Sequence, residues 1–77
     1  MDWHQRIVVD PAVLVGKPIL RGTRIPVQFV LELLAGGWSA KQILENYPGL
    51  TEDDVRACLA YAAERLESER VFPVATG

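Results

Sequence analysis

The side chains best suited to chemistry in this chain lie in the segment 16–27, GKPILRGTRIPV. They are Lys17, Arg21, Thr23 and Arg24. Gly22 suits the first central position of a type II′ turn, because that position needs a positive φ. Such a turn would place Arg21 and Arg24 opposite each other, with Cβ atoms roughly 5 Å apart. Two guanidinium groups held this way could receive a carboxylate or a phosphate. The alternative is that both side chains extend into water or pair with acids of the chain.

Catalytic chemistry has little support. Cys58 falls on or beside an apolar helical stripe and has no histidine near it in sequence, so we interpret it as a small core thiol. The acids at 52–54 are explained by their favourable interaction with the start of a helix. One histidine and one cysteine far apart cannot form an ordinary structural zinc site. We therefore expect no enzyme activity, no cofactor and no bound metal.

Size and charge restrict the function further. A chain of 77 residues predicts a single domain, residues 1–77, near the lower size limit for a self-sufficient core. A lone cysteine excludes an internal disulfide, so a homodimer is an expected way to bury more surface. No apolar run reaches the length of a membrane span, and the N-terminus lacks signal-peptide character. We therefore expect a cytoplasmic protein that does not bind membranes.

The basic residues are concentrated near the N-terminus. Residues 1–26 hold four basic and two acidic residues, whereas residues 27–77 hold four basic and eight acidic ones. Any polyanionic partner is therefore expected to meet the N-terminal part of the chain and not the helices.

Local patterns predict a β-prone part over residues 1–25, followed by helices. Residues 6–9, RIVV, form a short strand-like run, and residues 19–21 and 24–25 are expected to be hairpin arms. Pro26 suits the first turn of a helix that Gly36 and Gly37 end. Ser39 is a good N-cap for a second helix, AKQILENY, which Pro48 and Gly49 stop.

A third helix is expected to run from the cap residue Thr51 to about Ser68, with Asp54 close to a capping-box pattern. The side chains at helical spacing that should face the core are Val55, Leu59, Ala62 and Leu66. The expected fold is mainly α. A three-helix, homeodomain-like helix-turn-helix unit spans residues 26–68, with a short N-terminal β-strand and hairpin arm, and an apolar tail covers residues 69–77.

The short, glycine-containing connection between the second and third helices is typical of a helix-turn-helix. In that motif the start of the third helix approaches the bases. There Glu52 and Asp53 would be repelled by phosphates, and only Arg56 could make a favourable contact. DNA binding is therefore better assigned to Lys17, Arg21 and Arg24, presented by a two-fold pair of arms.

Protein binding is the other interpretation, and it rests on the apolar tail. Val71, Phe72 and Val74 lie beyond the last helix, next to Arg70. If exposed, they would form a docking segment for another protein. The alternative is that they fold back over their own small core.

The run GKPILRGTRIPV, followed by LLAGGWSAKQILENYPGLTEDDVRACLAYA, strongly resembles the family called domain of unknown function 433, over about residues 5–64. Members are similar to small bacterial antitoxins with a homeodomain-like fold, often encoded beside a PIN-like ribonuclease toxin, as in VapB and VapC pairs. The resemblance implies toxin neutralisation and repression of the shared operon. It also implies a target for Arg21, Arg24 or Arg70, namely the clustered carboxylates that hold metal in such nucleases.

The function expected first is therefore that of a type II antitoxin that neutralises a PIN-like ribonuclease. A stand-alone helix-turn-helix regulator that binds operator DNA is the first alternative, and an adaptor with no nucleic-acid role is the second. The expected DNA-binding or anion-binding residues are Lys17, Arg21, Thr23, Arg24 and Arg56. The expected partner-binding residues are Arg70, Val71, Phe72 and Val74.

Overall fold

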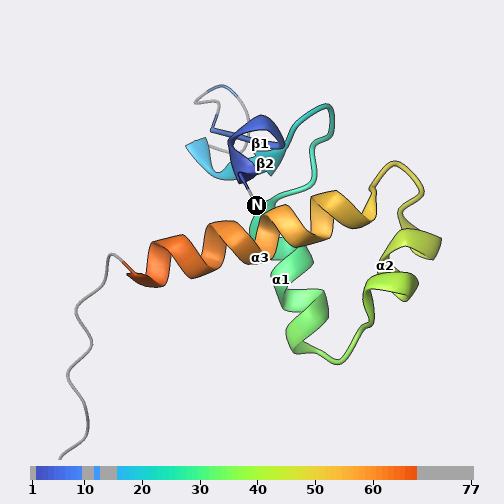
Figure 1. The fold of residues 1–77 in the computed structure, drawn as a ribbon. Helices are drawn as coiled ribbons and strands as arrows, with labels where there is room; N and C mark the ends of the chain where they lie inside the picture. Colours follow the sequence, from blue (N-terminus) through green and yellow to red (C-terminus); the bar gives the residue numbers. More distant parts are fainter. Residues whose placement is uncertain (1, 10–11, 13–15, 68–77) are drawn as a thin grey trace, which may run out of the picture.

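The computed structural model describes residues 2–9, 12 and 16–67, which form three helices and a small sheet (Figure 1). The elements in chain order are the 3₁₀ helix η1 (Trp3–Gln5), the strands β1 (Ile7–Val9) and β2 (Pro18–Leu20), and the helices α1 (Val27–Ala35), α2 (Ala40–Asn46) and α3 (Glu52–Glu67). The expected mainly helical architecture with a short N-terminal β element is confirmed. Within the described residues, no helix is long and apolar enough to cross a membrane.

The N-terminal sheet pairs two strands whose pairing the sequence pattern did not predict. β1 runs antiparallel to β2, with Ile7 opposite Leu20 and Val9 opposite Pro18. On its other side β2 makes a single bridge, between Ile19 and Pro26. Residues 19–21 therefore pair mainly with β1, and the expected hairpin with residues 24–25 is reduced to that bridge.

The turn after β2 contains Gly22 with φ 79°, so the expected positive φ is confirmed. The expected type II′ turn is wrong, because the turn begins one residue earlier. The Thr23 N–H donates to the Leu20 carbonyl over 3.0 Å, which makes Arg21 and Gly22 the central residues. Gly22 thus holds the second central position, where a type II turn needs positive φ. Arg21 and Arg24 therefore do not face each other across a two-residue loop.

Two helices begin at reciprocal caps, as the sequence predicts for Ser39 and Thr51. Ser39 Oγ accepts from the Gln42 N–H at 3.1 Å, and Gln42 Oε1 accepts from the Ser39 N–H at 2.8 Å. Thr51 Oγ1 accepts from the Asp54 N–H at 3.2 Å, and Asp54 Oδ2 accepts from the Thr51 N–H at 2.9 Å. Each cap satisfies two backbone donors that would otherwise lack partners. The starts of α2 and α3 are thereby fixed by local interactions. Pro26, expected inside the first turn of α1, is instead its N-cap residue.

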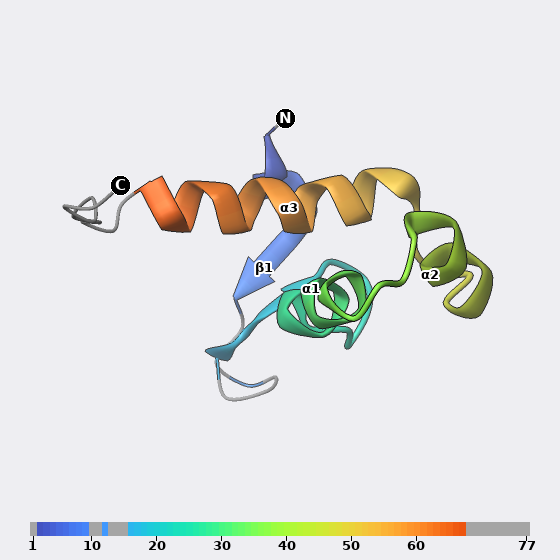
Figure 2. The same cartoon turned by 90° about the horizontal axis from the view of Figure 1, so that it is seen from below.

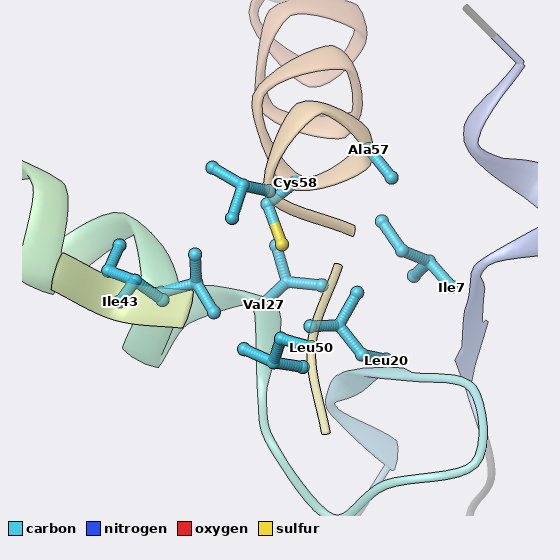
Figure 3. Close-up of a cluster of buried hydrophobic side chains, with 9 residues drawn as sticks. Ile7, Leu20, Val27, Ile43, Leu50, Ala57 and Cys58 are labelled. Atoms are coloured by element: carbon cyan, nitrogen blue, oxygen red, sulfur yellow. The ribbon is translucent and has the colours of Figure 1, made fainter. Parts of the chain in front are cut away.

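The core lies where α3 packs on α1, α2 and the N-terminal segment. Figure 3 shows apolar side chains from every part of the fold converging there, with Cys58 directed toward Val27. The members of this cluster are Ile7, Leu20, Val27, Val30, Ile43, Leu50, Val55, Ala57 and Cys58. A single small core therefore holds the arm and the three helices together.

The expected apolar stripe of α3 is only partly right. Val55 is buried and Ala62 is half-buried, but Leu59 is 49% exposed and Leu66 is 61% exposed. The buried side of the helix instead includes Ala57 and Cys58. Figure 2 shows the reason at the C-terminal end, where α3 extends past α1 and α2.

The 3₁₀ helix η1 fixes the N-terminal arm to α3. Trp3 is half-buried and meets the edge of Tyr61, with ring centroids 4.9 Å apart. Its indole N–H also donates to a Glu64 carboxylate oxygen. This anchor places the residues that follow, including Gln5 and Arg6, beside the helix.

Candidate functional site

A polar groove lies between the arm and the start of α3. It has a volume of about 240 Å³ and is lined by Gln5, Arg6, Arg21 and Asp54. Arg21 enters the groove from the end of β2. Its backbone N–H donates to the Arg6 carbonyl at 2.7 Å, and its Nε donates to the Gln5 carbonyl at 2.8 Å. These bonds continue the pairing of the two strands and hold the Arg21 side chain against the arm.

Arg6 reaches the first turn of α3 from the arm. One terminal nitrogen lies 3.2 Å from an Asp54 carboxylate oxygen, and the other lies 3.4 Å from Asp53. The first nitrogen also lies 3.4 Å from Thr51 Oγ1. The Asp54 side chain is only 14% exposed, so its charge would be costly without a cation. Arg6 therefore neutralises part of the acidic start of α3.

Arg6 is already paired with two carboxylates, so Arg21 supplies the positive charge that remains for an anion in this groove. Arg21 is exposed, and among the described residues its two terminal nitrogens have no hydrogen-bond partner. A carboxylate or phosphate entering the groove could accept two parallel hydrogen bonds from such a group. The pair of arginines that the structure brings together is therefore Arg6 with Arg21, and not Arg21 with Arg24.

Arg6 was missed as a site residue because its partners lie 45 to 48 residues further along the chain. Nothing in the local pattern RIVV distinguishes an arginine that pairs with distant acids from an ordinary residue beside a strand. The available signal was the cluster of three acids at 52–54, which needs a nearby cation once one of the acids is buried.

The other expected anion-binding residues do not join Arg21 in one groove. The Thr23 hydroxyl donates to the Leu20 carbonyl at 2.8 Å and accepts from the Ile25 N–H at 3.0 Å, so it stabilises the turn. Arg24 is exposed and has no acidic partner among the described residues. Arg56, on the exposed side of α3, pairs with Glu52 at 3.3 Å.

Lys17 lies at a separate groove of about 220 Å³ between β2, α1 and α3. Its lining is largely apolar and consists of Lys17, Pro18, Pro26, Val27, Gln28, Leu31 and Tyr61. This composition suits an apolar side chain better than a phosphate. The expected partner-binding residues Arg70, Val71, Phe72 and Val74 lie outside the described residues.

The cysteine and the histidine of this chain lie in different environments. Cys58 is fully buried, and this burial raises the pKa of its thiol to about 12, with a further contribution from the Asp54 carboxylate. His4 is exposed, with Nδ1 2.6 Å from an Asp2 carboxylate oxygen. A thiol that stays protonated at neutral pH is a weak nucleophile. Within the described residues, no group of three or more His, Cys, Asp or Glu could hold a metal ion.

A family model described as "Protein of unknown function (DUF433)" matches residues 7–62 of the chain. The match covers well over half of the sequence, so the chain belongs to the DUF433 family. The fold is similar to the crystal structure of a DUF433 member protein from Anabaena variabilis, with a TM-score of 0.75 and 37% sequence identity. That similarity covers 80% of this chain and 61% of the Anabaena chain.

Two relatives extend the comparison without naming an activity. An uncharacterized protein of Sinorhizobium fredii, y4eO, is 38% identical over 56 residues, which are 73% of this chain and 25% of that protein. An uncharacterized protein of Archaeoglobus fulgidus is 65% identical over 23 residues, which are 30% of this chain and 64% of that protein. The chain therefore spans about a quarter of the length of the first relative.

Proposed function

We propose that this protein is the antitoxin of a type II toxin–antitoxin pair and that it binds and neutralises a PIN-like ribonuclease. The observation that carries the proposal is the groove in which Arg6 and Arg21 meet. Clustered carboxylates that hold a catalytic metal are anionic and planar, which is the geometry that guanidinium groups bind best. The resemblance of residues 5–64 to antitoxin-like proteins supports the same choice of partner.

The two arginines have different roles in this proposal. Arg6 already pairs with Asp53 and Asp54, so its role is to position the arm and to offset these two acids. Arg21 is held by one side-chain nitrogen, at Gln5, and its terminal nitrogens are available to the toxin. We therefore assign the main contact with the toxin to Arg21. A carboxylate bound there would be drawn away from the metal it coordinates.

The control is Arg24, which lies three residues away in the same loop and is also exposed. The PIN-like ribonuclease proposed as the partner would be coexpressed with the wild type, with Arg21→Ala or with Arg24→Ala. We expect Arg21→Ala to weaken binding about tenfold or more, equivalent to about 1.4 kcal/mol, and to lose neutralisation. Arg24→Ala should retain both. Equal behaviour of the two variants would refute the assignment to Arg21, and absence of binding by the wild type would refute the antitoxin function.

We infer repression of the shared operon as a second role, carried by a homeodomain-like helix-turn-helix formed by α2 and α3. The connection between these helices spans only residues 47–51, and both helices begin at capping boxes. Arg6 offsets Asp53 and Asp54, and Arg56 offsets Glu52. The start of α3 is therefore less repulsive to DNA than its sequence alone suggests.

DNA binding is tested by a gel shift on the chain's own upstream DNA at increasing salt. Phosphate contacts from Lys17 and Arg24 should make the affinity fall steeply with salt concentration. The double variant Lys17→Ala/Arg24→Ala should make the plot of log affinity against log salt concentration less steep, by the amount expected for about two phosphate contacts. A protein that shifts no DNA at low salt would be a toxin-binding or adaptor protein without a role on the operator.

A further inference from the structure

The exposed face of α3 carries an apolar stripe that has no partner within the described residues. Leu59 is 49% exposed and Leu66 is 61% exposed, and Ala63 between them is also exposed. Spacings of four and seven residues place these side chains on one face of a helix. Figure 2 shows that the C-terminal half of α3 projects beyond α1 and α2, so neither helix covers it.

A groove with both apolar and charged lining residues lies beyond the N-terminal end of the stripe. Glu52 lies seven residues before Leu59 and therefore on the same face of α3. It borders an open groove against α2, of about 440 Å³, that is lined by Ala40, Lys41, Leu44, Glu45 and Glu52. The stripe and this groove lie on the same face of α3, and Ala40 and Leu44 are the apolar residues of the groove.

We propose that this surface binds a second copy of the same chain, with the two α3 helices antiparallel about a two-fold axis. Leu59 of one copy lies opposite the partner's Leu66, and Ala62 lies opposite the partner's Ala63. The small residues are then at the centre, where they allow the two helix backbones to approach closely. Each copy covers both of its exposed leucines, and the isologous contact is self-complementary.

Charge complementarity selects the second copy and the antiparallel direction. Arg56 and Glu67 lie on the same flank of the stripe, and the side chain of Arg56 is 65% exposed although it also pairs with Glu52 at 3.3 Å. In the antiparallel pair, Arg56 and the partner's Glu67 lie on the same side, separated by two positions or roughly 3 Å along the axis. The two-fold axis creates this ion pair twice. In a parallel pair Arg56 would instead meet the side of the partner's α3 that carries Val55 and Cys58, whose side chains are buried and offer no charged partner.

The small size of the core explains why a second copy would be needed. The described core contains ten buried hydrophobic residues, and two of the larger aliphatic side chains of α3 remain outside it. Association that buries these two side chains would stabilise the folded chain, because only the folded state can form the dimer. The inference is independent of the toxin, because neither Arg6 nor Arg21 belongs to this surface.

The first test is the solution mass of the purified full chain, measured by sedimentation equilibrium against a monomer mass of 8.5 kDa. We expect twice that mass for the wild type and the monomer mass for Leu59→Glu/Leu66→Glu. Trp38→Glu is the matched control, since Trp38 is another partly exposed large hydrophobic residue, outside α3. It should leave the dimer intact. A monomeric wild type, or a dimeric Leu59→Glu/Leu66→Glu variant, would overturn the proposal.

Charge exchange tests the antiparallel direction with variants whose substitutions are exposed. Arg56→Glu and Glu67→Arg should each weaken the dimer several-fold, because each places like charges together. The double variant Arg56→Glu/Glu67→Arg should recover most of the affinity. Circular dichroism of each variant verifies that the helices are retained. If the double variant loses as much dimerisation free energy as the two single variants together, the antiparallel register is wrong.

Discussion

Arg6 and Asp54 are 48 residues apart in the sequence, yet a guanidinium nitrogen of one lies 3.2 Å from a carboxylate oxygen of the other. This ion pair joins the N-terminal arm to the first turn of α3. It also places Arg6 beside Arg21, in the groove to which we assign toxin binding. The fold and the candidate site therefore depend on the same contact.

The Arg6–Asp54 pair should stabilise the fold measurably, because Asp54 is mostly buried. A double-mutant cycle with Arg6→Met and Asp54→Asn, measured by urea unfolding, should give a coupling energy of about 1 kcal/mol. The matched cycle with Asp53→Asn should give less than about 0.5 kcal/mol, since that side chain is 51% exposed. Equal coupling energies in the two cycles would show that burial does not determine the strength of the Arg6–Asp54 ion pair.

Gly22 should be required for its backbone conformation alone. Its φ is 79°, and a Cβ added there would meet nothing within 4 Å. Gly22→Ala should therefore cost about 1 kcal/mol of stability. Gly49→Ala is the control, because that position also has open space and its φ lies outside the left-handed region. It should be neutral or slightly stabilising, and an equal loss at both positions would contradict the turn geometry.

Cys58 should make stability fall with pH in the alkaline range. Burial raises the pKa of its thiol from 9.0 to about 12, so the unfolded chain releases this proton first. The favourable contribution is complete below about pH 9 and is lost between pH 9 and 12, with a slope of up to about 1.4 kcal/mol per pH unit. The difference between wild type and Cys58→Ala isolates this slope from other groups. A difference that stays constant between pH 8 and pH 11 would exclude a shifted thiol.

The capping box at the start of α2 should contribute about 1 kcal/mol. Ser39→Ala removes the acceptor for the Gln42 N–H and should lower the unfolding free energy by that amount. Ser39→Gly should cost only a few tenths of a kcal/mol, because glycine is tolerated at an N-cap. Thermal unfolding followed by circular dichroism measures both. A greater loss for the glycine variant would indicate that propensity, and not the cap, sets the stability of α2.

Local signals predicted the helices well, since each depends on neighbours in the sequence. Ser39 and Thr51 cap α2 and α3 as expected. The positive φ of Gly22 was predicted correctly. Its position in the turn was predicted wrongly, because β2 pairs with β1 and ends at Leu20. The partner of a strand depends on residues that are distant in the sequence, and the local hairpin pattern holds no information about them.

The candidate site was harder to predict, because tertiary contacts define it. Arg21 was identified from its position in the turn, whereas Arg6 became a groove residue only through its contact with Asp54. Leu59 and Leu66 were expected in the core from their spacing. Periodicity identifies an apolar face of a helix, but it cannot distinguish a face that packs on the same chain from one left open to a partner.

The most direct test of the proposed function is a double-mutant cycle between this protein and the PIN-like ribonuclease that we propose as its partner. Affinities would be measured by calorimetry for wild type and Arg21→Ala, each against the nuclease with its metal-binding carboxylates intact or replaced by amides. A direct contact predicts a coupling energy of at least about 1.5 kcal/mol between Arg21 and those carboxylates. Additive effects of the two changes would contradict the assignment of Arg21 to the metal site of the toxin.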